Sequence, residues 1–139
     1  MTPLEISTDR DRLDVDMIYG VLSESYWARG RQQDVVQTSI NNSLCFGAYL
    51  DGRQVGFARV ITDYAVFGYV ADVFVLDDYQ GRGYARQLLQ AIVDHPDVQG
   101  LKLLMLATRD AHGLYEQFGF ELMPGSDKVM TLFAIKDDG

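Results

Sequence analysis

The sequence predicts an α/β (α+β) fold that contains both antiparallel hairpins and a parallel strand–helix–strand unit. The strongest observation is residues 69–89, where a nearly continuous apolar run passes through a glycine-rich turn into a pattern of helical period. Residues 44–50 and 54–61 add two strands joined by Asp51-Gly52, a dipeptide that favours a tight hairpin turn. Strand and helix patterns follow one another along the chain in the order β-α-α-β-β-β-α-β-α-β.

A chain of 139 residues with 47% apolar and 12% aromatic residues is expected to fold as a single domain, residues 1–139. No apolar run reaches the ~18 residues that a membrane span requires, and the first residues lack the basic and apolar blocks of a signal peptide. Cys45 is the only cysteine and allows no internal disulfide, which fits a reducing cytoplasm. We therefore expect a cytoplasmic protein without a membrane partner, and the sequence leaves a homodimer open.

The formal net charge of −8 argues against a nucleic-acid partner, since binding to DNA or RNA depends on clustered lysine and arginine. The charge favours cationic partners instead. His95 and His112 are too few and too far apart in the sequence for a metal site, and no Cys-x-x-Cys or His-Glu-x-x-His motif is present. We expect no bound metal, and Cys45 is more typical of a buried strand residue than of a nucleophile.

The first forty residues predict one short strand and two helices. Residues 4–7 alternate briefly and indicate an edge strand, after which Asp9 or Asp11 is placed to cap a helix. The apolar stripe of that helix is Leu13, Met17, Ile18, Val21 and Leu22. A connector at residues 25–31 holds the only tryptophan, and a second helix follows at residues 32–42.

The rest of the chain is organised around the strand at residues 69–76, whose nearly continuous apolar positions predict burial on both faces. The later elements that we predict are, in order, a helix from Tyr84 to His95-Pro96, a strand at residues 101–107, a helix at residues 111–118, and a closing hairpin of residues 120–123 and 129–135. The two buried strands and the helix between them should form a right-handed parallel crossover.

Residues 80–85, with the sequence QGRGYA, form the turn between the central strand and its helix. A glycine-rich turn that opens a helix presents free backbone N–H groups and the positive end of the helix dipole at one place, which suits a phosphate. The plainer interpretation is a tight turn that needs the backbone freedom of glycine. The dinucleotide-binding fingerprint does not fit, because it requires glycine or alanine where Arg86 stands.

The segment QGRGYA resembles the Q/R-x-x-G-x-G/A signature of the GCN5-related N-acetyltransferases (the GNAT family), with the preceding strand and the following helix in place. Residues 114–120, LYEQFGF, resemble the second signature of that family at about the expected separation. The resemblance covers roughly the C-terminal half and points to a small, single-domain member of bacterial type. It implies a mixed, mostly antiparallel sheet of about seven strands with helices on both faces. It also implies a splay between the two parallel central strands that admits the pantetheine arm of acetyl-CoA.

The resemblance implies an enzyme that transfers the acetyl group of acetyl-CoA directly to a primary amine of a small acceptor, without a metal. Two alternatives stay open, namely a non-catalytic module that binds or senses acyl-CoA, and an enzyme that uses another acyl group such as succinyl. By resemblance, the residues that hold the pyrophosphate are Gly81, Arg82, Gly83, Tyr84, Ala85 and Arg86. The backbone of Val73, Phe74 and Val75 would pair with the pantetheine amides like an added strand.

Tyr115 occupies the position at which the family keeps its general acid. Attack of an amine on the thioester expels a thiolate, and a phenol with a pKa near ~10 is protonated at neutral pH and can donate to it. The alternative interpretation is that Tyr115 is an aromatic core residue of a short helix. Asp72, the charged residue of the central strand, is a candidate general base. Burying a carboxylate is costly, so its presence in a buried strand indicates either a functional role or a partner for its charge. It could equally pair with Arg59 on the neighbouring strand or bond a backbone amide, and some family members need no dedicated base.

The candidate residues of the acceptor pocket are Tyr26, Trp27, Asp63, Tyr64 and Phe67. Core or surface packing explains each of them about as well. Because Asp63 and Asp72 flank the expected cleft and the net charge is −8, we expect a small cationic amine to be preferred over an acidic one. The family often has an asparagine about two turns before the tyrosine, but residues 108–113, TRDAHG, lack it.

Overall fold

The computed structural model describes residues 3–123, 127 and 129–132. The strands in this part of the chain are β1 (Glu5–Ser7), β2 (Leu44–Leu50), β3 (Arg53–Thr62), β4 (Phe67–Val75) and β5 (Leu103–Met105). The α-helices are α1 (Val15–Glu24), α2 (Gln33–Asn41), α3 (Tyr84–Asp94), α4 (Pro96–Gln99) and α5 (His112–Glu116). Two short 3-10 turns, η1 (Arg10–Arg12) and η2 (Asp77–Tyr79), precede α1 and α3.

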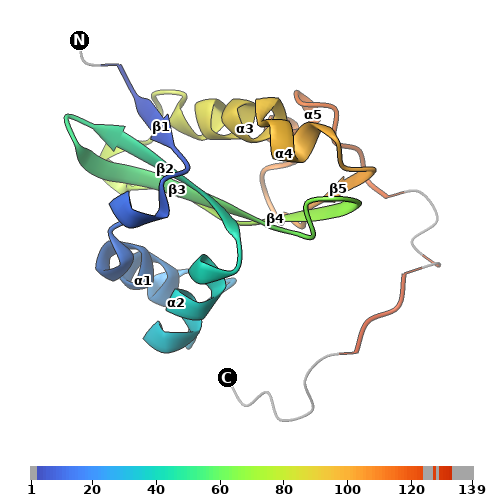
Figure 1. The fold of residues 1–139 in the computed structure, drawn as a ribbon, viewed down its shortest axis with the longest axis horizontal. Helices are drawn as coiled ribbons and strands as arrows, with labels where there is room; N and C mark the ends of the chain where they lie inside the picture. The colour runs from blue at the N-terminus through green and yellow to red at the C-terminus, as the bar shows by residue number, and fades with distance from the viewer. Residues whose placement is uncertain (1–2, 124–126, 128, 133–139) are drawn as a thin grey trace.

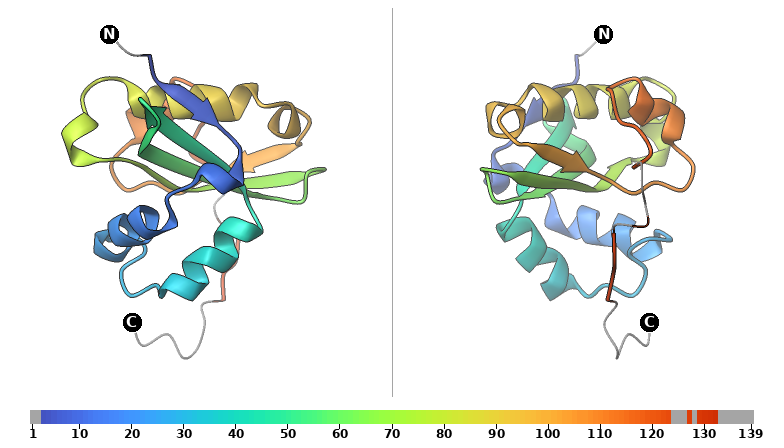
Figure 2. Two further views of the ribbon diagram at one scale, coloured as in Figure 1. Left: turned by 60° about the vertical axis from the view of Figure 1, so that its left-hand side comes forward. Right: turned by 90° about the vertical axis from the view of Figure 1, so that its right-hand side faces the viewer.

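The strands form one mixed sheet in the order β1-β2-β3-β4-β5. The first four pair antiparallel, and β4 pairs parallel with β5 across the connection that contains α3 and α4. Helices cover both faces of the sheet. In Figure 1, α1 and α2 lie below it while α3, α4 and α5 lie above it, and Figure 2 shows the same division from two further directions. The predicted order of elements and the parallel crossover are therefore confirmed as far as α5, except that the crossover contains the short helix α4 in addition to the predicted helix.

Each face of the sheet carries its own apolar core. The α3-side core includes Phe46, Ala48, Val60, Leu88, Leu89 and Ile92, each at most 1% exposed. The opposite core, toward α1 and α2, includes Ile18, Leu22, Val36, Ile40 and Phe57, each also at most 1% exposed. Full burial of one such side chain is worth about 1.5–3 kcal/mol, so these apolar stripes are what attach the helices to the sheet.

The hairpin between β2 and β3 turns where the sequence predicts. Asp51 and Gly52 both have positive φ, at 50° and 82°, as a two-residue turn of this kind requires. Pro96 likewise separates α3 from α4 and occupies the first turn of α4, where its missing N–H leaves no helical bond unmade. These local signals need no long-range information.

The cap of α1 differs from the prediction. Asp14, rather than Asp9 or Asp11, caps the helix by accepting a hydrogen bond from the backbone N–H of Met17 at 3.1 Å. Asp9 instead caps η1, because the chain makes one 3-10 turn before α1 begins. The backbone N–H of Asp14 in turn donates to Oε1 of Gln54 at 2.7 Å, which ties the start of α1 to β3.

In the described part of the chain the sheet has five strands rather than the predicted seven. Residues 120–123 and 129–132 form no strand, and the remainder of the predicted closing hairpin lies outside the described residues. The strand predicted at residues 101–107 is also shorter, because β5 spans only Leu103–Met105. A strand persists only where a neighbour satisfies its backbone groups, and within the described part of the chain β5 pairs only with the start of β4.

A bulge in β4 decides which of its side chains face which core. Between Ala71 and Phe74, two residues of β4 oppose a single residue of β3, and Asp72 lies in this bulge with a φ of +56°. Val70 packs in the α3-side core and Phe74 in the opposite core, although a regular strand would place residues four apart on one face. Side chains of β4 therefore pack on both faces of the sheet, as predicted, and buried and half-buried residues alternate along the strand.

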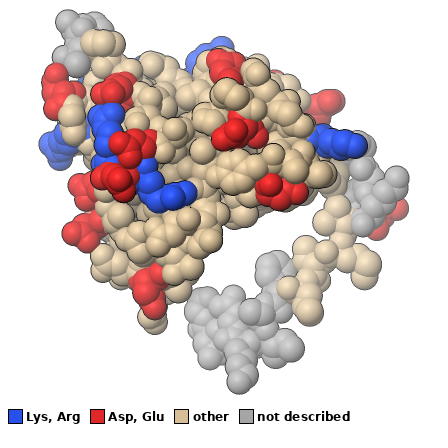
Figure 3. All heavy atoms as spheres, in the orientation of Figure 1, with Lys and Arg blue, Asp and Glu red and all other residues tan. Residues whose placement is uncertain are grey.

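The surface of the molecule carries both signs of charge. Acidic residues outnumber lysine and arginine by 20 to 12, and on the face drawn in Figure 3 the two kinds are interspersed. Across the described ranges, no helix combines the length and the apolar character that crossing a membrane requires.

Candidate active site

The glycine-rich turn opens toward free space at the start of α3. Gly81 and Gly83 have φ of +81° and +82°, in the left-handed region that favours glycine, and Gly83 is the N-cap residue of α3. A Cβ atom added at either glycine would meet no heavy atom within 4 Å. No side chain caps α3, which leaves the N–H groups of its first turn for a ligand. An anion suits this place, because these donors and the helix dipole act in the same direction.

Two exposed arginines flank the turn. Arg82 donates from Nη2 to the backbone carbonyl of Asp78 at 3.4 Å. Arg86 donates to Oε1 of Gln117, and its guanidinium carbon lies 5.3 Å from the ring centroid of Phe118. Arg86 therefore connects the first turn of α3 to the end of α5. Arg82 belongs to the turn and Arg86 follows it in the first turn of α3, so their positive charges would add to the attraction of a phosphate.

Beyond Tyr69, β4 and β5 separate. β4 has nine residues, and its parallel pairing with β5 covers only the first three of them. The later stretch contains Val73, Phe74 and Val75, and toward β5 its backbone has no strand partner within the described residues. An extended ligand can pair with such an open edge. The carbonyl of Val75 is already used, since it accepts a hydrogen bond from Nε2 of Gln80 at 3.0 Å.

A pocket of about 680 Å³ opens beside this separation, and we call it the acceptor pocket. The connector between α1 and α2, the middle of β4 and the segment leading into α5 all contribute to its walls. Among its lining residues are Tyr26, Trp27, Arg31, Asp72, Arg109 and Tyr115. The pocket thus brings together both predicted catalytic residues and two of the predicted acceptor residues.

Asp72 is held by three hydrogen-bond donors. Its Oδ2 accepts from Nε of Arg59 at 2.6 Å and from Nη1 of Arg31 at 2.8 Å. Its Oδ1 accepts from Nε1 of Trp27 at 2.8 Å. Burial would by itself raise the pKa of this carboxyl, but the three donors outweigh burial and lower the pKa. Asp72 is ionised at neutral pH and unsuited to act as a base, and the pairing with Arg59 that the sequence left open is the arrangement observed.

Tyr115, on α5, lines the acceptor pocket and also packs against the α3-side core. Its ring meets that of Phe120 edge-on, with the ring centroids 5.9 Å apart. Burial, with Tyr26 and Asp110 as smaller causes, raises the pKa of its phenol. A phenol with a raised pKa keeps its proton at neutral pH, as a general acid must. Packing and proton donation are therefore compatible at this position.

Tyr26 and Trp27 form an aromatic pair on the connector, with ring centroids 5.3 Å apart in an edge-to-face arrangement. The guanidinium carbon of Arg109 lies 3.7 Å from the ring centroid of Tyr26, which is cation–π contact distance. This contact joins the connector to the segment before α5. Trp27 is fixed separately by its hydrogen bond to Asp72, so both aromatic residues have a defined place in the pocket.

Asp63, Tyr64 and Phe67, the other predicted acceptor residues, do not line this pocket. Oδ1 of Asp63 accepts hydrogen bonds from the backbone N–H groups of Ala65, Val66 and Phe67 at between 2.8 and 3.1 Å. These bonds lower the pKa of the Asp63 carboxyl and close the loop between β3 and β4. The loop stands at the start of β4, whereas the pocket surrounds the bulge in its middle, so these residues are assigned to the hairpin.

Sequence reasoning missed three charged residues of the pocket, Arg31, Arg109 and Asp110. One signal for Arg31 was available, because a buried carboxylate such as Asp72 needs more than one donor. Nothing local distinguishes Arg109 and Asp110 from solvated loop residues. Only the position of the loop relative to Tyr26 makes them part of a site.

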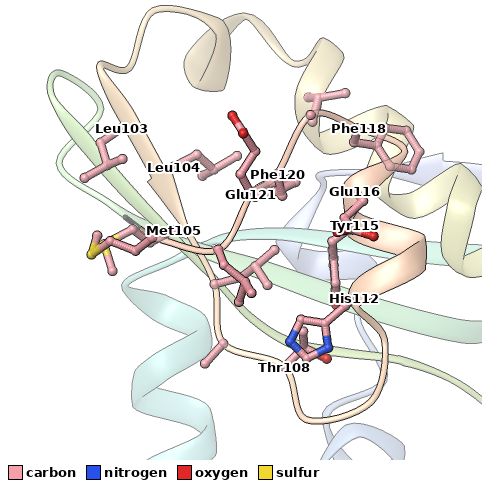
Figure 4. Close-up of a pocket in the computed structure, with 16 residues that line it drawn as sticks. Leu103, Leu104, Met105, Thr108, His112, Tyr115, Glu116, Phe118, Phe120 and Glu121 are labelled. Atoms are coloured by element: carbon pink, nitrogen blue, oxygen red, sulfur yellow. The ribbon is translucent and has the colours of Figure 1, made fainter. Parts of the chain in front are cut away.

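A second pocket of about 620 Å³ lies between β5 and α5 (Figure 4). Its labelled side chains come from β5, from Thr108 in the segment between β5 and α5, and from α5 and the residues after it. Tyr115 contributes to both pockets. The network of arginine and aspartate side chains belongs to the first pocket.

The structure also bears on two other kinds of chemistry, a cysteine nucleophile and a bound metal. Cys45 is buried in β2, and burial raises the pKa of its thiol to about 11, so the thiol is protonated at neutral pH. In the described part of the chain, no three histidine, cysteine, aspartate or glutamate side chains are grouped closely enough to hold a metal ion.

Comparison with known proteins establishes the family. Residues 41–122 match the acetyltransferase (GNAT) domain. A Gibberella zeae protein named "Putative acetyltransferase FG08082" is 34% identical over 133 residues, which span 79% of this chain and 74% of that relative. The chain belongs to the GNAT acetyltransferase family, whose members use acetyl-CoA.

Particular relatives refine the comparison. The crystal structure of a GNAT-family protein from Xanthomonas campestris pv. campestris is 47% identical and superposes with a TM-score of 0.93 over 96% of this chain and 95% of that one. A Clostridium acetobutylicum structure with acetyl-CoA has a TM-score of 0.67 at 14% identity over 96% of each chain, which shows the shared fold. An L-methionine sulfoximine/L-methionine sulfone acetyltransferase of Pseudomonas aeruginosa is 37% identical over 54 residues, 36% of this chain and 31% of that protein.

Proposed function

We propose that the protein is an acetyl-CoA-dependent N-acetyltransferase that transfers the acetyl group directly to a primary amine of a small acceptor. The observation that carries the proposal is the position of Tyr115. It lines the pocket that also contains Val73 of the open stretch of β4. Its helix is joined to the glycine turn through the contact between Arg86 and Gln117. An acyl donor held at the turn and along β4 would therefore end beside a protonated phenol.

The chain offers groups that fit each part of acetyl-CoA. The N–H groups of residues 81–86 and the positive end of α3 would hold the pyrophosphate, with the two arginines of that stretch adding charge. The pantetheine arm would pair with the backbone of Val73 and Phe74, while Gln80 already occupies the carbonyl of Val75. These are local donors, and they act against the overall negative charge of the protein.

The transfer needs one proton donated and one removed. The amine nitrogen bonds to the thioester carbonyl carbon, the carbon–sulfur bond breaks, and the sulfur takes a proton from the phenol of Tyr115. A positioned general acid of this kind is worth roughly 10²–10⁴-fold in rate. The acceptor nitrogen gives up one proton to solvent, because Asp72 is already engaged by three donors, and the phenolate of Tyr115 takes a proton back from solvent.

The size of the acceptor pocket supports a small acceptor. A volume of about 680 Å³ lies within the range of small-molecule sites, and the acetyl end of the donor takes up part of it. The Pseudomonas aeruginosa relative, named for acetylation of L-methionine sulfoximine and L-methionine sulfone, supports an acceptor of similar size.

Release of free thiol from acetyl-CoA, followed with a thiol reagent across a panel of small primary amines, tests this function. We expect release above the amine-free background for at least one amine, with the N-acetylated product identified by mass spectrometry. Binding of acetyl-CoA without any amine-dependent release would instead indicate a binding or sensing module. Failure to bind acetyl-CoA would contradict the assignment of the turn and of β4.

A further inference from the structure

The acceptor pocket contains a buried charge cluster that is not neutral. Two guanidinium groups, those of Arg31 and Arg59, share a single carboxylate oxygen of Asp72 at 2.8 Å and 2.6 Å. The second oxygen of Asp72 takes its hydrogen bond from the uncharged indole of Trp27. Two positive charges thus meet one negative charge, and the cluster keeps one positive charge.

Arg31 carries this excess charge toward the pocket. Arg59 is the inner partner, with a side chain 9% exposed and a further hydrogen bond from Nη1 to Oγ of Ser43 at 3.0 Å. The side chain of Arg31 is 23% exposed and lines the pocket, and in the described part of the chain its guanidinium has no hydrogen bond other than that to Asp72. A partly buried cation with donors to spare is best satisfied by a carboxylate, which accepts two parallel N–H bonds.

Tyr115 determines where the amine has to lie. Asp110 lines the same pocket and is close enough to contribute to the raised pKa of the Tyr115 phenol, so its carboxylate can attract an ammonium group before the proton is lost. Arg109, stacked on Tyr26, adds a second cation to the pocket wall. One pocket therefore offers a carboxylate near Tyr115 and guanidinium groups from the connector and the neighbouring loop.

We propose that the acceptor carries a carboxylate as well as its amine, and that Arg31 binds the carboxylate. The substrate class is a small amino acid or a close analogue, and the inference rests on the proposed acetyltransferase function. It reverses the preference for cationic amines expected from the net charge of −8. The carboxylate is unchanged in the reaction, in which the nitrogen gains the acetyl group and the thiol is released.

Matched acceptors test the proposal on the wild-type protein. Each of several amino acids, including glycine, β-alanine and L-methionine, is compared with its own primary amide, which keeps the amine and removes the negative charge. We expect kcat/KM for at least one acid to exceed that of its amide by about tenfold to a hundredfold, the range for loss of a hydrogen bond to a charged group. Equal or better use of the amides throughout would overturn the inference, yet leave the acetyltransferase function in place.

Arg31→Gln tests the residue itself. We expect this variant to lower kcat/KM for the preferred acid by about tenfold to a hundredfold, mainly by raising KM. The kcat/KM for the matching amide should change by less than about threefold. Arg29→Gln, which removes an exposed arginine of the same connector outside the pocket, is the matched control and should behave like the wild type. Arg31→Lys should recover part of the loss, because it restores the charge without the planar pair of donors.

The outcomes separate the two proposals. Arg31→Gln leaves Asp72 paired with Arg59, so we expect the variant to fold, and thermal unfolding checks this. Equal losses for acid and amide would show that Arg31 has a structural role only and would overturn the inference. Absence of thiol release with every amine would overturn the function, and with it the inference.

Discussion

At the scale of single residues, Asp72 combines two properties that are usually separate. Its φ of +56° lies in the left-handed region, which aspartate and asparagine enter more readily than most residues. Its carboxylate binds two arginines and a tryptophan. The same residue therefore shapes the bulge of β4 and organises the wall of the acceptor pocket.

Asp72→Asn should lower the free energy of unfolding by about 3–5 kcal/mol at neutral pH, because it leaves buried guanidinium groups without their counter-charge. The folded-state pKa of Asp72 is lowered, so its stabilisation is fully present above the ordinary aspartate pKa of about 3.9. It is lost as the pH falls through the lower folded value. Urea denaturation of the wild type and of Asp72→Asn at a series of pH values measures the difference between their free energies of unfolding. We expect this difference to become smaller only at acidic pH.

Asp51→Asn is the matched control for this substitution. Asp51 also has positive φ, at 50°, but it is exposed in the β2–β3 turn, so we expect a change within about 0.5 kcal/mol. A loss of less than about 1 kcal/mol for Asp72→Asn would mean that the charge cluster contributes little to the stability of the fold.

Tyr115→Phe should lower kcat by roughly 10²-fold or more while acetyl-CoA binds as before, because only the proton donor is removed. Since the phenol acts in its protonated form and its pKa is raised, the wild type should lose activity only at a pH above the usual tyrosine value. Steady-state kinetics over pH measure both effects. Tyr19→Phe on α1, outside both pockets, is the control, and unchanged turnover in Tyr115→Phe would reduce Tyr115 to a packing residue.

At the scale of elements, the site depends on how β4 continues into α3. The strand leaves its pairing with β5 after Tyr69, continues as an open edge, and passes through the glycine turn into the helix. The buried stripe of α3 holds the helix against the sheet, which fixes the direction of its N-terminal donors. The proposed acetyl-CoA site is therefore a property of strand, turn and helix together rather than of one motif.

Gly83→Val should abolish the rise in melting temperature that acetyl-CoA produces, because the side chain would occupy the open space at the start of α3. Gly52→Val is a close control, since both glycines have φ of +82° with no neighbouring atom in the way. In both variants the valine has to adopt a left-handed backbone conformation, which should lower the free energy of unfolding by about 1–2 kcal/mol. Only Gly83→Val should fail to bind acetyl-CoA. Retention of acetyl-CoA affinity by Gly83→Val would refute the phosphate assignment.

At the scale of the whole molecule, total charge and local charge point in opposite directions. The net charge of −8 favours a cationic acceptor, yet the wall of the acceptor pocket carries Arg31, Arg59 and Arg109 against Asp72 and Asp110. Charges more than about 8 Å apart at the surface are largely screened at physiological ionic strength, so the local set decides what the pocket binds. The interspersed surface charges in Figure 3 mainly affect the solubility of the protein and the rate at which it encounters charged molecules.

Features that depend on near neighbours in the chain could be predicted from the amino-acid sequence alone. Hydrophobic period, the Asp51-Gly52 turn and the glycine-rich segment predicted the helices and strands from β1 to α5 except α4, and the two motifs placed the chain in its family. These signals suffice because side-chain periodicity and backbone preference are local properties.

The combination of charged residues in the pocket, by contrast, depends on the folded chain. The bulge at Asp72 turns the carboxylate toward the α1–α2 connector, where Arg31, 41 positions away in the chain, reaches it. In the same fold, the side chain of Asp63 binds the backbone of its own hairpin loop. The guanidinium group of Arg109 lies over the ring of Tyr26. An ion pair forms wherever folding brings its two partners together. No pattern among neighbouring residues in the sequence shows which distant residues will meet. The set of residues that line the acceptor pocket is therefore a consequence of strand register and packing, which depend on burial of residues far apart in the chain.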